Sequence, residues 1–226
     1  MASINVRMDV PADPASPAAD LFIYNSISLP RRLAGLQNIG LQPYRRTALL
    51  VEAPAGISII DWPLIIDIDE QYYVKPDAGL LLISPADETP TPPCDVFPEE
   101  IDIATAVYRA ELALNLGVRS VRRSWAGLRS FVCDRTPVAG FDAKAPGFFW
   151  LAGQGGYGIQ TAPALARLAA SMVMDLPLPA DLIDCGVDPR DCPPCGCSSH
   201  AWPASSYSPS CCPAVRPHCR RVACLA

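Results

Sequence analysis

The stretch GFFWLAGQGGYGIQTAPALARLAA, residues 147–170, decides the fold of this chain. It begins with a short apolar run, rich in aromatics, that has the length of a β-strand. Four glycines then fall within the six positions 153–158. From Thr161 onward, apolar residues recur at spacings of three and four, which predicts a helix. The pattern therefore predicts a strand, a glycine loop and the start of a helix.

A glycine loop that opens a helix is suited to an electron-rich ligand. Glycine lets the backbone approach a ligand closely and adopt positive φ angles. The first N–H groups of a helix have no internal acceptor, and the helix dipole favours negative charge beside them. From the glycines alone, a tight strand–helix turn without any ligand is an equal alternative.

The residues before this stretch predict a sheet with one helix. A proline-rich loop is expected at 85–98, followed by a helix that begins near Pro98 and ends near Leu116. Its apolar face toward the sheet should consist of Ile103, Val107, Ala110, Leu112 and Leu114. The longest strand is expected to bend and break at Gly127. Alternating or β-branched runs predict strands at 42–52, 64–69, 71–75, 80–84 and 118–132, and residues 137–141 lead back to the stretch at 147–170.

The two ends of the chain are less regular. Residues 1–20 are rich in proline and alanine and are expected to be disordered. A strand at 21–29 and a helical turn at 31–36 are expected to follow. Prolines stop the last helix after Leu176, and from Asp191 onward cysteine, proline, serine and arginine follow one another without periodicity.

Four motifs together resemble the D-amino acid oxidase family of FAD-dependent oxidoreductases, in particular its bacterial D-arginine and D-amino acid dehydrogenases. The resemblance runs from about Leu33 to about Asp188, and the motifs follow one another in family order. They are LQPYRRTA at 41–48, DWPLIIDIDEQYYVKPDAGLLLISPADETP at 61–90, WAGLRSFV at 125–132 and GQGGYGIQT at 153–161.

The resemblance implies an α/β (α+β) fold. It consists of the mixed, largely antiparallel sheet of a substrate domain and the C-terminal strand, glycine loop and helix of an FAD domain. The sequence lacks a G-x-G-x-x-G fingerprint after a first strand, which the family places far upstream, so the N-terminal Rossmann part is expected to be missing. The implied segments are a lead-in at 1–20, a remnant of the FAD domain at 21–40, a substrate domain at 41–141, the C-terminal FAD-domain strand and helix at 142–188, and a Cys/Pro-rich tail at 189–226.

The resemblance also implies FAD as the cofactor, with the glycine loop against the flavin ring. Backbone N–H groups from Gly156 to Gln160 would meet the pyrimidine edge, where reduced flavin is anionic. Gln160 is equally compatible with capping the helix. The implied cofactor-binding residues are Gly153, Gln154, Gly155, Gly156, Tyr157, Gly158, Ile159, Gln160 and Thr161.

A D-amino acid substrate would need a group that binds its carboxylate, and an arginine fork fits two carboxylate oxygens. By resemblance, Arg129 would bind the carboxylate, Tyr73 would donate to it, Arg46 would be a second arginine near the substrate, and Gly156 would also belong to the substrate site. The alternatives are a surface arginine for Arg46, a packing residue for Tyr73 and a structural ion pair for Arg129.

Strand alternation separates these residues from their neighbours. Side chains alternate between the two faces of a strand, so Arg45 and Tyr72 should point away from Arg46 and Tyr73. Lys75 either hydrogen-bonds near flavin N5 or ends a strand at the surface.

Other function classes are disfavoured. No histidine precedes His200, so no histidine base, hydrolase triad or zinc-hydrolase site is expected in the body, and no catalytic residue or metal ligand is assigned. The net charge of −5 disfavours nucleic acid, and no apolar run suits a membrane span or a secretory signal. Only Cys94 and Cys133 precede Cys185, which favours a cytoplasmic location.

Three functions follow in order of preference. The first is oxidation of a D-amino acid, D-arginine-like, to its imino acid by hydride transfer to flavin N5. The second is a non-catalytic fragment that cannot hold FAD alone and depends on a missing N-terminal FAD-binding half as its partner. The third and most distant is a metal-binding module in the tail, where Cys192 and Cys195 have zinc-knuckle spacing, against a disordered tail as the alternative.

Overall fold

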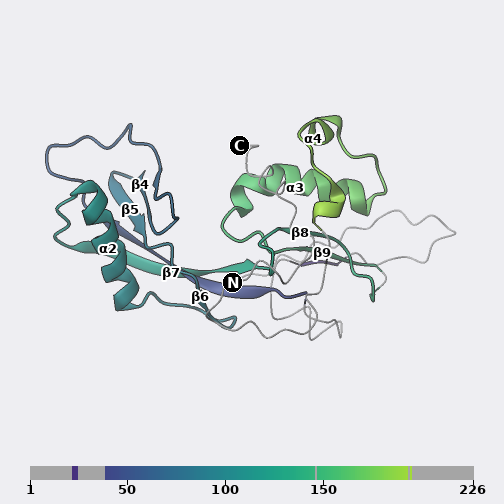
Figure 1. Cartoon of the computed structure of the whole chain (residues 1–226), viewed down its shortest axis with the longest axis horizontal. Helices are drawn as coiled ribbons and strands as arrows, with labels where there is room; N and C mark the ends of the chain where they lie inside the picture. The colour runs from purple at the N-terminus through teal and green to yellow at the C-terminus, as the bar shows by residue number, and fades with distance from the viewer. Residues whose placement is uncertain (1–21, 25–38, 146, 193, 195–226) are drawn as a thin grey trace. The chain divides into compact units, whose positions relative to one another are not determined.

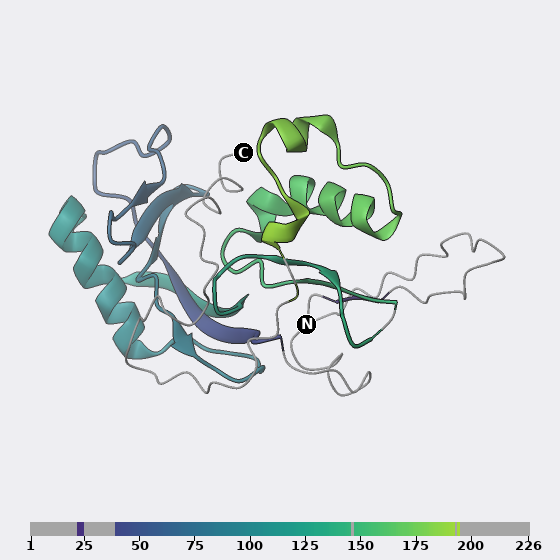
Figure 2. The same cartoon turned by 45° about the vertical axis from the view of Figure 1, so that its right-hand side comes forward.

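The computed structural model describes residues 22–24, 39–145, 147–192 and 194. The chain divides into two compact units (Figure 1, Figure 2). Unit 1 combines Met1–Gln42 with Ser130–Ala226, and unit 2 is Pro43–Arg129. Both mix helices with strands, and the strand pairs of the whole chain with a defined register are mostly antiparallel, as the sequence predicts.

A single sheet with the strand order β3-β4-β5-β2-β6 forms the body of unit 2, and β7 pairs with β2 as well. Neighbouring strands along this order are antiparallel where their register is defined; β3, β4 and β5 follow one another as in a meander, whereas β2 lies between β5 and β6. The strands are β2 (Gln42–Val51), β3 (Ile65–Ile66), β4 (Tyr73–Asp77), β5 (Leu80–Ser84), β6 (Thr89–Pro90) and β7 (Val121–Phe131).

Helix α2 (Glu100–Leu114) packs on one face of this sheet. Ala106 and Ala110 on the helix are fully buried against a cluster of sheet residues that includes Leu49, Val74 and Ile83. Small residues on the helix let it lie close to the sheet, and burial of the aliphatic strand residues stabilises the unit by roughly 1.5–3 kcal/mol per side chain.

Unit 1 contains a three-stranded sheet in which β1 (Phe22–Tyr24) runs parallel to β9 (Phe148–Ala152) and β8 (Val138–Phe141) runs antiparallel to it. Helix α3 (Gly158–Val173) packs against it through Leu165 and Leu168, which contact Phe149 (Figure 1). The short helix α4 (Ala180–Asp184) and a 3-10 turn (Pro189–Asp191) follow α3.

Several predicted elements are confirmed with small shifts in their ends. The predicted strands at 42–52, 80–84 and 147–152 correspond to β2, β5 and β9. The helix predicted from Thr161 begins three residues earlier, at Gly158. The remaining expectations for 1–20 and 31–36 lie outside the described residues.

Four expectations about local structure are wrong. Strand β7 runs unbroken through Gly127, because its pairing with β2 holds the backbone extended. The strand predicted at 64–69 ends at Ile66, because the Asp67 carboxylate accepts the N–H groups of Asp69 and Gln71 and forms a turn. The predicted loop at 85–98 contains β6, and Leu112 is exposed on α2.

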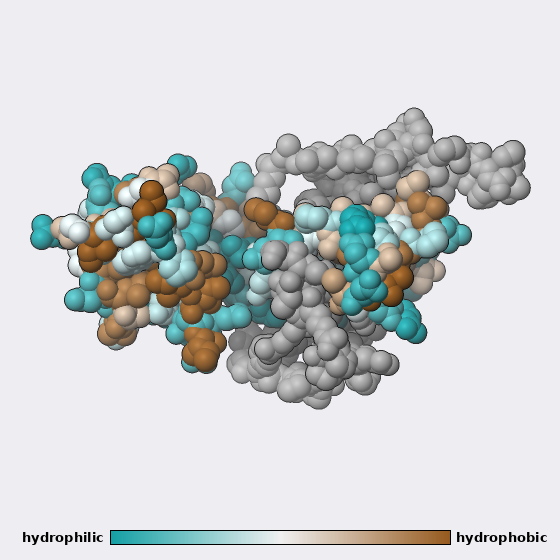
Figure 3. Space-filling view, turned by 90° about the horizontal axis from the view of Figure 1, so that it is seen from above, coloured by the Kyte–Doolittle hydropathy of each residue, from teal (hydrophilic) through white to brown (hydrophobic). Residues whose placement is uncertain are grey.

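The surface of unit 2 carries several exposed isoleucines, and hydrophobic residues gather on this unit in Figure 3. Those more than half exposed include Ile57, Ile60, Ile66 and Ile68. Within the described part of the chain, no helix has the length and apolar character needed to cross a membrane.

Candidate functional site

The two arginines Arg45 and Arg46 lie on opposite faces of β2, as strand alternation predicts. The register pairs Arg45 with Thr89 on antiparallel β6. Continuing this register places Glu88 opposite Arg46 and Asp87 opposite Thr47, and the hydrogen bonds between these side chains agree with it.

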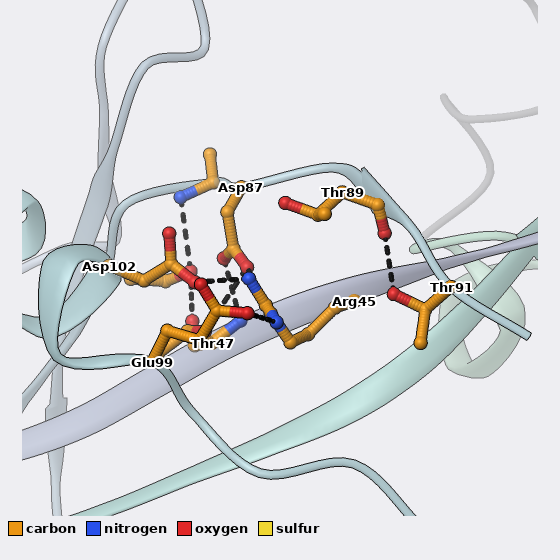
Figure 4. Close-up of polar contacts among 9 residues, drawn as sticks. Arg45, Thr47, Asp87, Thr89, Thr91, Glu99 and Asp102 are labelled. Carbon is orange, nitrogen blue, oxygen red and sulfur yellow. Dashed lines mark hydrogen bonds and ion pairs between the residues drawn. The ribbon is translucent and has the colours of Figure 1, made fainter. Parts of the chain in front are cut away.

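Arg45 is buried and belongs to an ion cluster that joins the sheet to the start of α2 (Figure 4). Its guanidinium donates to Glu99 and, through Nη2, to Asp102 Oδ2 at 2.9 Å. Its Nε lies 3.9 Å from Asp87 Oδ2. The hydrogen bond to Glu99 raises the pKa of Arg45 above its ordinary, already high value. With three carboxylates around it, Arg45 is a structural residue rather than a ligand-binding one.

Asp87 accepts two hydrogen bonds from Thr47, from the backbone N at 2.6 Å and from Oγ1 at 3.1 Å. Its carboxylate is only 8% exposed. Burial raises the pKa of Asp87, although the bonds from Thr47 act in the opposite direction. The folded chain therefore holds a proton on Asp87 at a pH where the unfolded chain has released it.

This shift predicts a pH-dependent contribution to stability. Because the folded pKa of Asp87 is raised, its contribution is largest below the unfolded value of about 4 and falls as the pH rises through the folded value. The free energy of unfolding of the wild type minus that of Asp87→Asn, measured by urea denaturation, should therefore fall as the pH rises above about 4. A difference that stays constant with pH would contradict the assignment.

On the other face of the sheet, Arg46 and Tyr73 lie on the same side. The register pairs Leu49 with Ile83, which places Ala48 opposite Ser84, and Ser84 faces Tyr73. Arg46 is two positions from Ala48 and so shares its face. The Tyr73 hydroxyl makes no hydrogen bond with any residue that the structure describes.

Arg46 is largely buried, with 13% of its side chain exposed, so it is not a surface arginine. Its Nη2 donates to Glu88 Oε1 at 2.8 Å, whereas its Nε is buried without a partner. Burial lowers the pKa of Arg46, and the charge of Arg129 lowers it further. The two guanidinium groups are therefore close enough to repel each other.

Arg129 lies near the end of β7 and is partly exposed. No described residue forms an ion pair or hydrogen bond with its guanidinium, so the alternative of a structural ion pair gains no support there. Arg46 bonds the Glu88 carboxylate, whereas Arg129 has no such carboxylate among the described residues. The Arg129 guanidinium is therefore suited to an anionic ligand.

The glycine loop between β9 and α3 belongs to unit 1. Gly153 and Gly155 have φ angles of 73° and 54°, which glycine adopts at low cost. The Gly155 N–H donates to Ser130 O at 3.0 Å. A Cβ on Gly155 would lie within 2.7 Å of three carbons of the Phe131 ring, so this position accepts only glycine in the observed packing.

The start of α3 presents free N–H groups. No described residue accepts from the backbone N–H groups of Gly158, Ile159 or Gln160, whereas the N–H and Oγ1 of Thr161 both donate to Tyr157 O at 2.9 Å. No acidic residue lies in the first turn, and no side-chain hydrogen bond among the described residues caps it, so the capping alternative for Gln160 gains no support. Three donors without a described acceptor, at a positive helix end, fit the electron-rich edge of a flavin.

The start of α2, by contrast, is unsuited to the pyrophosphate of FAD. Glu99, Glu100 and Asp102 surround it with negative charge. The glycine loop itself has the literal spacing G-x-G-x-x-G at Gly153, Gly155 and Gly158, a match that the sequence prediction overlooked. Its context differs from a dinucleotide fingerprint, because the Phe131 ring fills the space beside the second glycine that a pyrophosphate would need.

Other candidates have structural roles or lie outside the described chain. Lys75 Nζ pairs with Asp77 at 3.2 Å at the surface, which agrees with the surface alternative. Among the described residues, no three His, Cys, Asp or Glu side chains converge on a possible metal site. The tail with Cys195 lies outside them.

Comparison with protein families now decides the class of protein. Residues 24–172 match the model of the family described as DAO, FAD dependent oxidoreductase. The chain belongs to this family. The family implies a flavin cofactor, and the free N–H groups at the start of α3 fit that expectation.

The relatives of this DAO chain are longer than the chain itself. It is 28% identical over 145 residues to FAD-dependent oxidoreductase domain-containing protein 1 of Xenopus laevis, covering 60% of this chain and 28% of that protein. Glycine oxidase from Geobacillus kaustophilus aligns with a TM-score of 0.57 and 22% identity, over 72% of this chain and 43% of the other. L-proline dehydrogenase from P. horikoshii aligns with a TM-score of 0.56 and 22% identity, over 69% and 44%. These identities show a shared fold, and the chain spans less than half of each relative.

Two residues that sequence reasoning missed contribute to these sites. Glu88 bonds Arg46, and Phe131 packs beneath Gly155. The sequence carries a signal for Glu88 only once the register of β6 against β2 is known. No pattern in the sequence predicts that Phe131 faces the loop.

Proposed function

We propose that this DAO chain supplies the carboxylate-binding face and the flavin-ring loop of an FAD-dependent oxidoreductase that acts on a D-amino acid, with D-arginine as the preferred type. One observation supports it above the others: no described residue bonds the Arg129 guanidinium. The charge of Arg129 also lowers the pKa of Arg46, which is itself paired with Glu88. Such a pair is suited to a carboxylate, the group that every amino acid carries.

In this proposal the chain acts chiefly by binding and orienting. When bound, FAD supplies the acceptor for the hydride of the substrate Cα–H. Arg129 and Arg46 hold the carboxylate, and the free hydroxyl of Tyr73 donates to it. Fixing the carboxylate fixes the direction of the Cα–H bond, which lowers the entropy cost of the reaction. No histidine base is required when the substrate amine is already neutral.

The glycine loop has an electrostatic role in the same proposal. The N–H groups of Gly158, Ile159 and Gln160 would face the pyrimidine edge of the ring, where negative charge develops on reduction. Donors fixed in place before the reaction stabilise such charge without reorganisation. Gly156 is exposed and has no Cβ, which allows a close approach of the substrate or the ring.

A second candidate is a chain that is inactive on its own. The start of α2 is acidic and would repel pyrophosphate. At the start of α3, the Phe131 ring occupies the space beside Gly155 that a pyrophosphate would need. We therefore propose that the dinucleotide half of the FAD site comes from a segment outside these 226 residues.

Titration of the purified chain with FAD distinguishes the two candidates. We expect weak binding, with a Kd above about 10 μM, because the pyrophosphate half of the site contributes much of the affinity. The readout is the quenching of flavin fluorescence, with riboflavin as a ligand that lacks the pyrophosphate. Equal affinity for FAD and riboflavin would agree with a ring-only site, whereas much tighter binding of FAD would refute the inactive-alone candidate.

A further inference from the structure

The ring of Phe131 contacts both the glycine loop and the turn that follows β7. A Cβ on Gly155 would lie within 2.7 Å of three carbons of this ring. The guanidinium of Arg135 lies over the ring, with its Cζ atom 4.8 Å from the ring centroid. A guanidinium within about 6 Å of an aromatic centroid makes a favourable cation–π contact. The Phe131 ring therefore connects the charge of Arg135 with the loop.

Two hydrogen bonds shape the turn that carries Arg135. The backbone N–H of Arg135 donates to Val132 O, and that of Thr136 donates to Asp134 Oδ1, both at 3.0 Å. The φ angle of Arg135 is 61°, a left-handed conformation that is uncommon in residues with a Cβ. Such a conformation persists where the surrounding contacts offset its cost. The contact with the Phe131 ring is one of them.

The same turn also borders the first glycine of the loop. Val132 Cγ1 and Thr136 O each lie 3.7 Å from the position that a Cβ on Gly153 would occupy. The Gly155 N–H donates to Ser130 O at 3.0 Å. The segment from Ser130 to Thr136 thus contacts the loop at two glycines with positive φ angles. Neighbours that fix a loop before its ligand arrives reduce the entropy cost of binding.

We propose that Arg135 is a positioning residue of the flavin-ring loop: its cation–π contact holds Phe131, and Phe131 holds Gly155 in the conformation that the flavin would meet. The flavin part rests on the proposed function, whereas the support of the loop by Arg135 does not. A loop with four glycines has many accessible conformations, so contacts from outside the loop are needed to select one. Arg135 acts through the ring and does not have to touch the cofactor.

Amide hydrogen exchange of the full chain, followed by NMR, measures how firmly the loop is held. Arg135 is exposed, and Arg135→Met removes its charge while keeping a long side chain and a Cβ on the left-handed backbone. We expect the Gly155 N–H to exchange about twofold to fivefold faster in Arg135→Met. Arg135→Lys keeps a cation over the ring, so its rate should stay near that of the wild type. Unchanged exchange in Arg135→Met, or equal acceleration in both variants, would overturn the proposal.

A double-mutant cycle separates the pair from whatever else each side chain contacts. Phe131→Leu keeps an apolar side chain beside Gly155 but removes the aromatic ring. Unfolding equilibrium constants from urea denaturation should show a coupling of about twofold to fivefold between Arg135→Met and Phe131→Leu. Additive effects would mean that Arg135 acts without the ring, which would also overturn the proposal.

Arg123→Met is the matched control. Arg123 is an exposed residue of β7, and its Cζ lies 5.9 Å from the centroid of the Trp125 ring. The control removes the same charge and the same kind of contact, so the exchange of the Gly155 N–H should equal that of the wild type. Acceleration equal to that in Arg135→Met would assign the effect to lost charge in general and refute the role of Arg135.

Riboflavin titration distinguishes a failure of this inference from a failure of the proposed function. Arg135→Met should bind riboflavin about twofold to fivefold more weakly than the wild type, and Arg135→Lys should bind it nearly as well. Unchanged affinity in Arg135→Met would refute the positioning role. If the wild type binds no riboflavin while the exchange and the coupling are as expected, the flavin site fails and the support of the loop by Arg135 stands.

Discussion

Gly155→Ala should lower the free energy of unfolding by about 2–5 kcal/mol, a large share of the stability of an ordinary domain. Two costs add at this position. The φ angle of 54° disfavours any residue with a Cβ, and the new methyl group would overlap the Phe131 ring. Urea denaturation of the purified variant gives the loss, and near-UV circular dichroism reports whether the packing of Phe131 changes.

The neighbouring glycines are controls for the two costs. Gly153 has a φ of 73°, but a Cβ there would meet its neighbours only at 3.7 Å, so Gly153→Ala should cost about 1 kcal/mol. Gly158 carries no positive φ, and its nearest neighbour is Gln154 Cβ at 3.4 Å, so Gly158→Ala should change stability by less than about 0.5 kcal/mol.

Phe131→Ala removes the source of the overlap and tests the cause. The double variant with Gly155→Ala should lose less stability than the sum of the two single variants, because the new methyl group then has space. Additive losses would show that backbone strain alone explains the effect of Gly155→Ala. The physical contact between loop and ring would then have no energetic role.

The sequence predicts the elements of this fold well where local pattern and tertiary environment agree. Strand β5 is predicted to the residue, because LLLIS is an uninterrupted apolar run between turn residues. The opposite faces of Arg45 and Arg46 follow from strand alternation alone, and the structure confirms them.

The errors arise where pairing or a side chain overrides the local pattern. Gly127 was expected to break β7, but hydrogen bonding to β2 keeps the strand extended there. Ile68 was expected in a strand, but the Asp67 carboxylate binds the N–H groups that a strand would pair. Local composition carries no information about which partner a backbone group finds.

In the candidate site, too, some residues are predicted from the sequence and others depend on contacts that form only in the fold. Motif resemblance supplies Arg46, Tyr73 and Arg129; the structure places Arg46 and Tyr73 on one face of the sheet of unit 2, and Arg129 close enough to lower the pKa of Arg46. Their roles in binding stay predictions. Glu88 and Phe131 could not be predicted, because each acts through a contact that exists only after the strands and the loop have met.

Arg129→Ala should weaken the binding of propionate at least about 100-fold, the largest effect expected at the carboxylate site. A charged, bidentate arginine contributes two hydrogen bonds of about 1.5–3 kcal/mol each to a carboxylate. Because no described residue bonds the Arg129 guanidinium, its removal leaves no buried protein group unpaired. Folding should therefore survive, and the loss should appear in binding, measured by NMR titration.

Arg46→Ala should weaken propionate binding less, by about tenfold, because Glu88 already neutralises part of the Arg46 charge. This variant should also lose stability, since it removes the ion pair between Arg46 and the largely buried Glu88 carboxylate. The two arginines should thus differ in kind: Arg129 affects binding alone, whereas Arg46 affects binding and folding together.

Arg122→Ala is the control for Arg129→Ala on the same strand. Arg122 is exposed, pairs with Glu52 and lies an odd number of positions from Arg129, on the opposite face of β7. It removes the same charge, so a general electrostatic effect would weaken propionate binding equally in both variants. Unchanged binding in Arg122→Ala beside the loss in Arg129→Ala would assign the anion to one face of the sheet. Equal losses would instead reduce the proposed site to nonspecific attraction by the net charge of the unit.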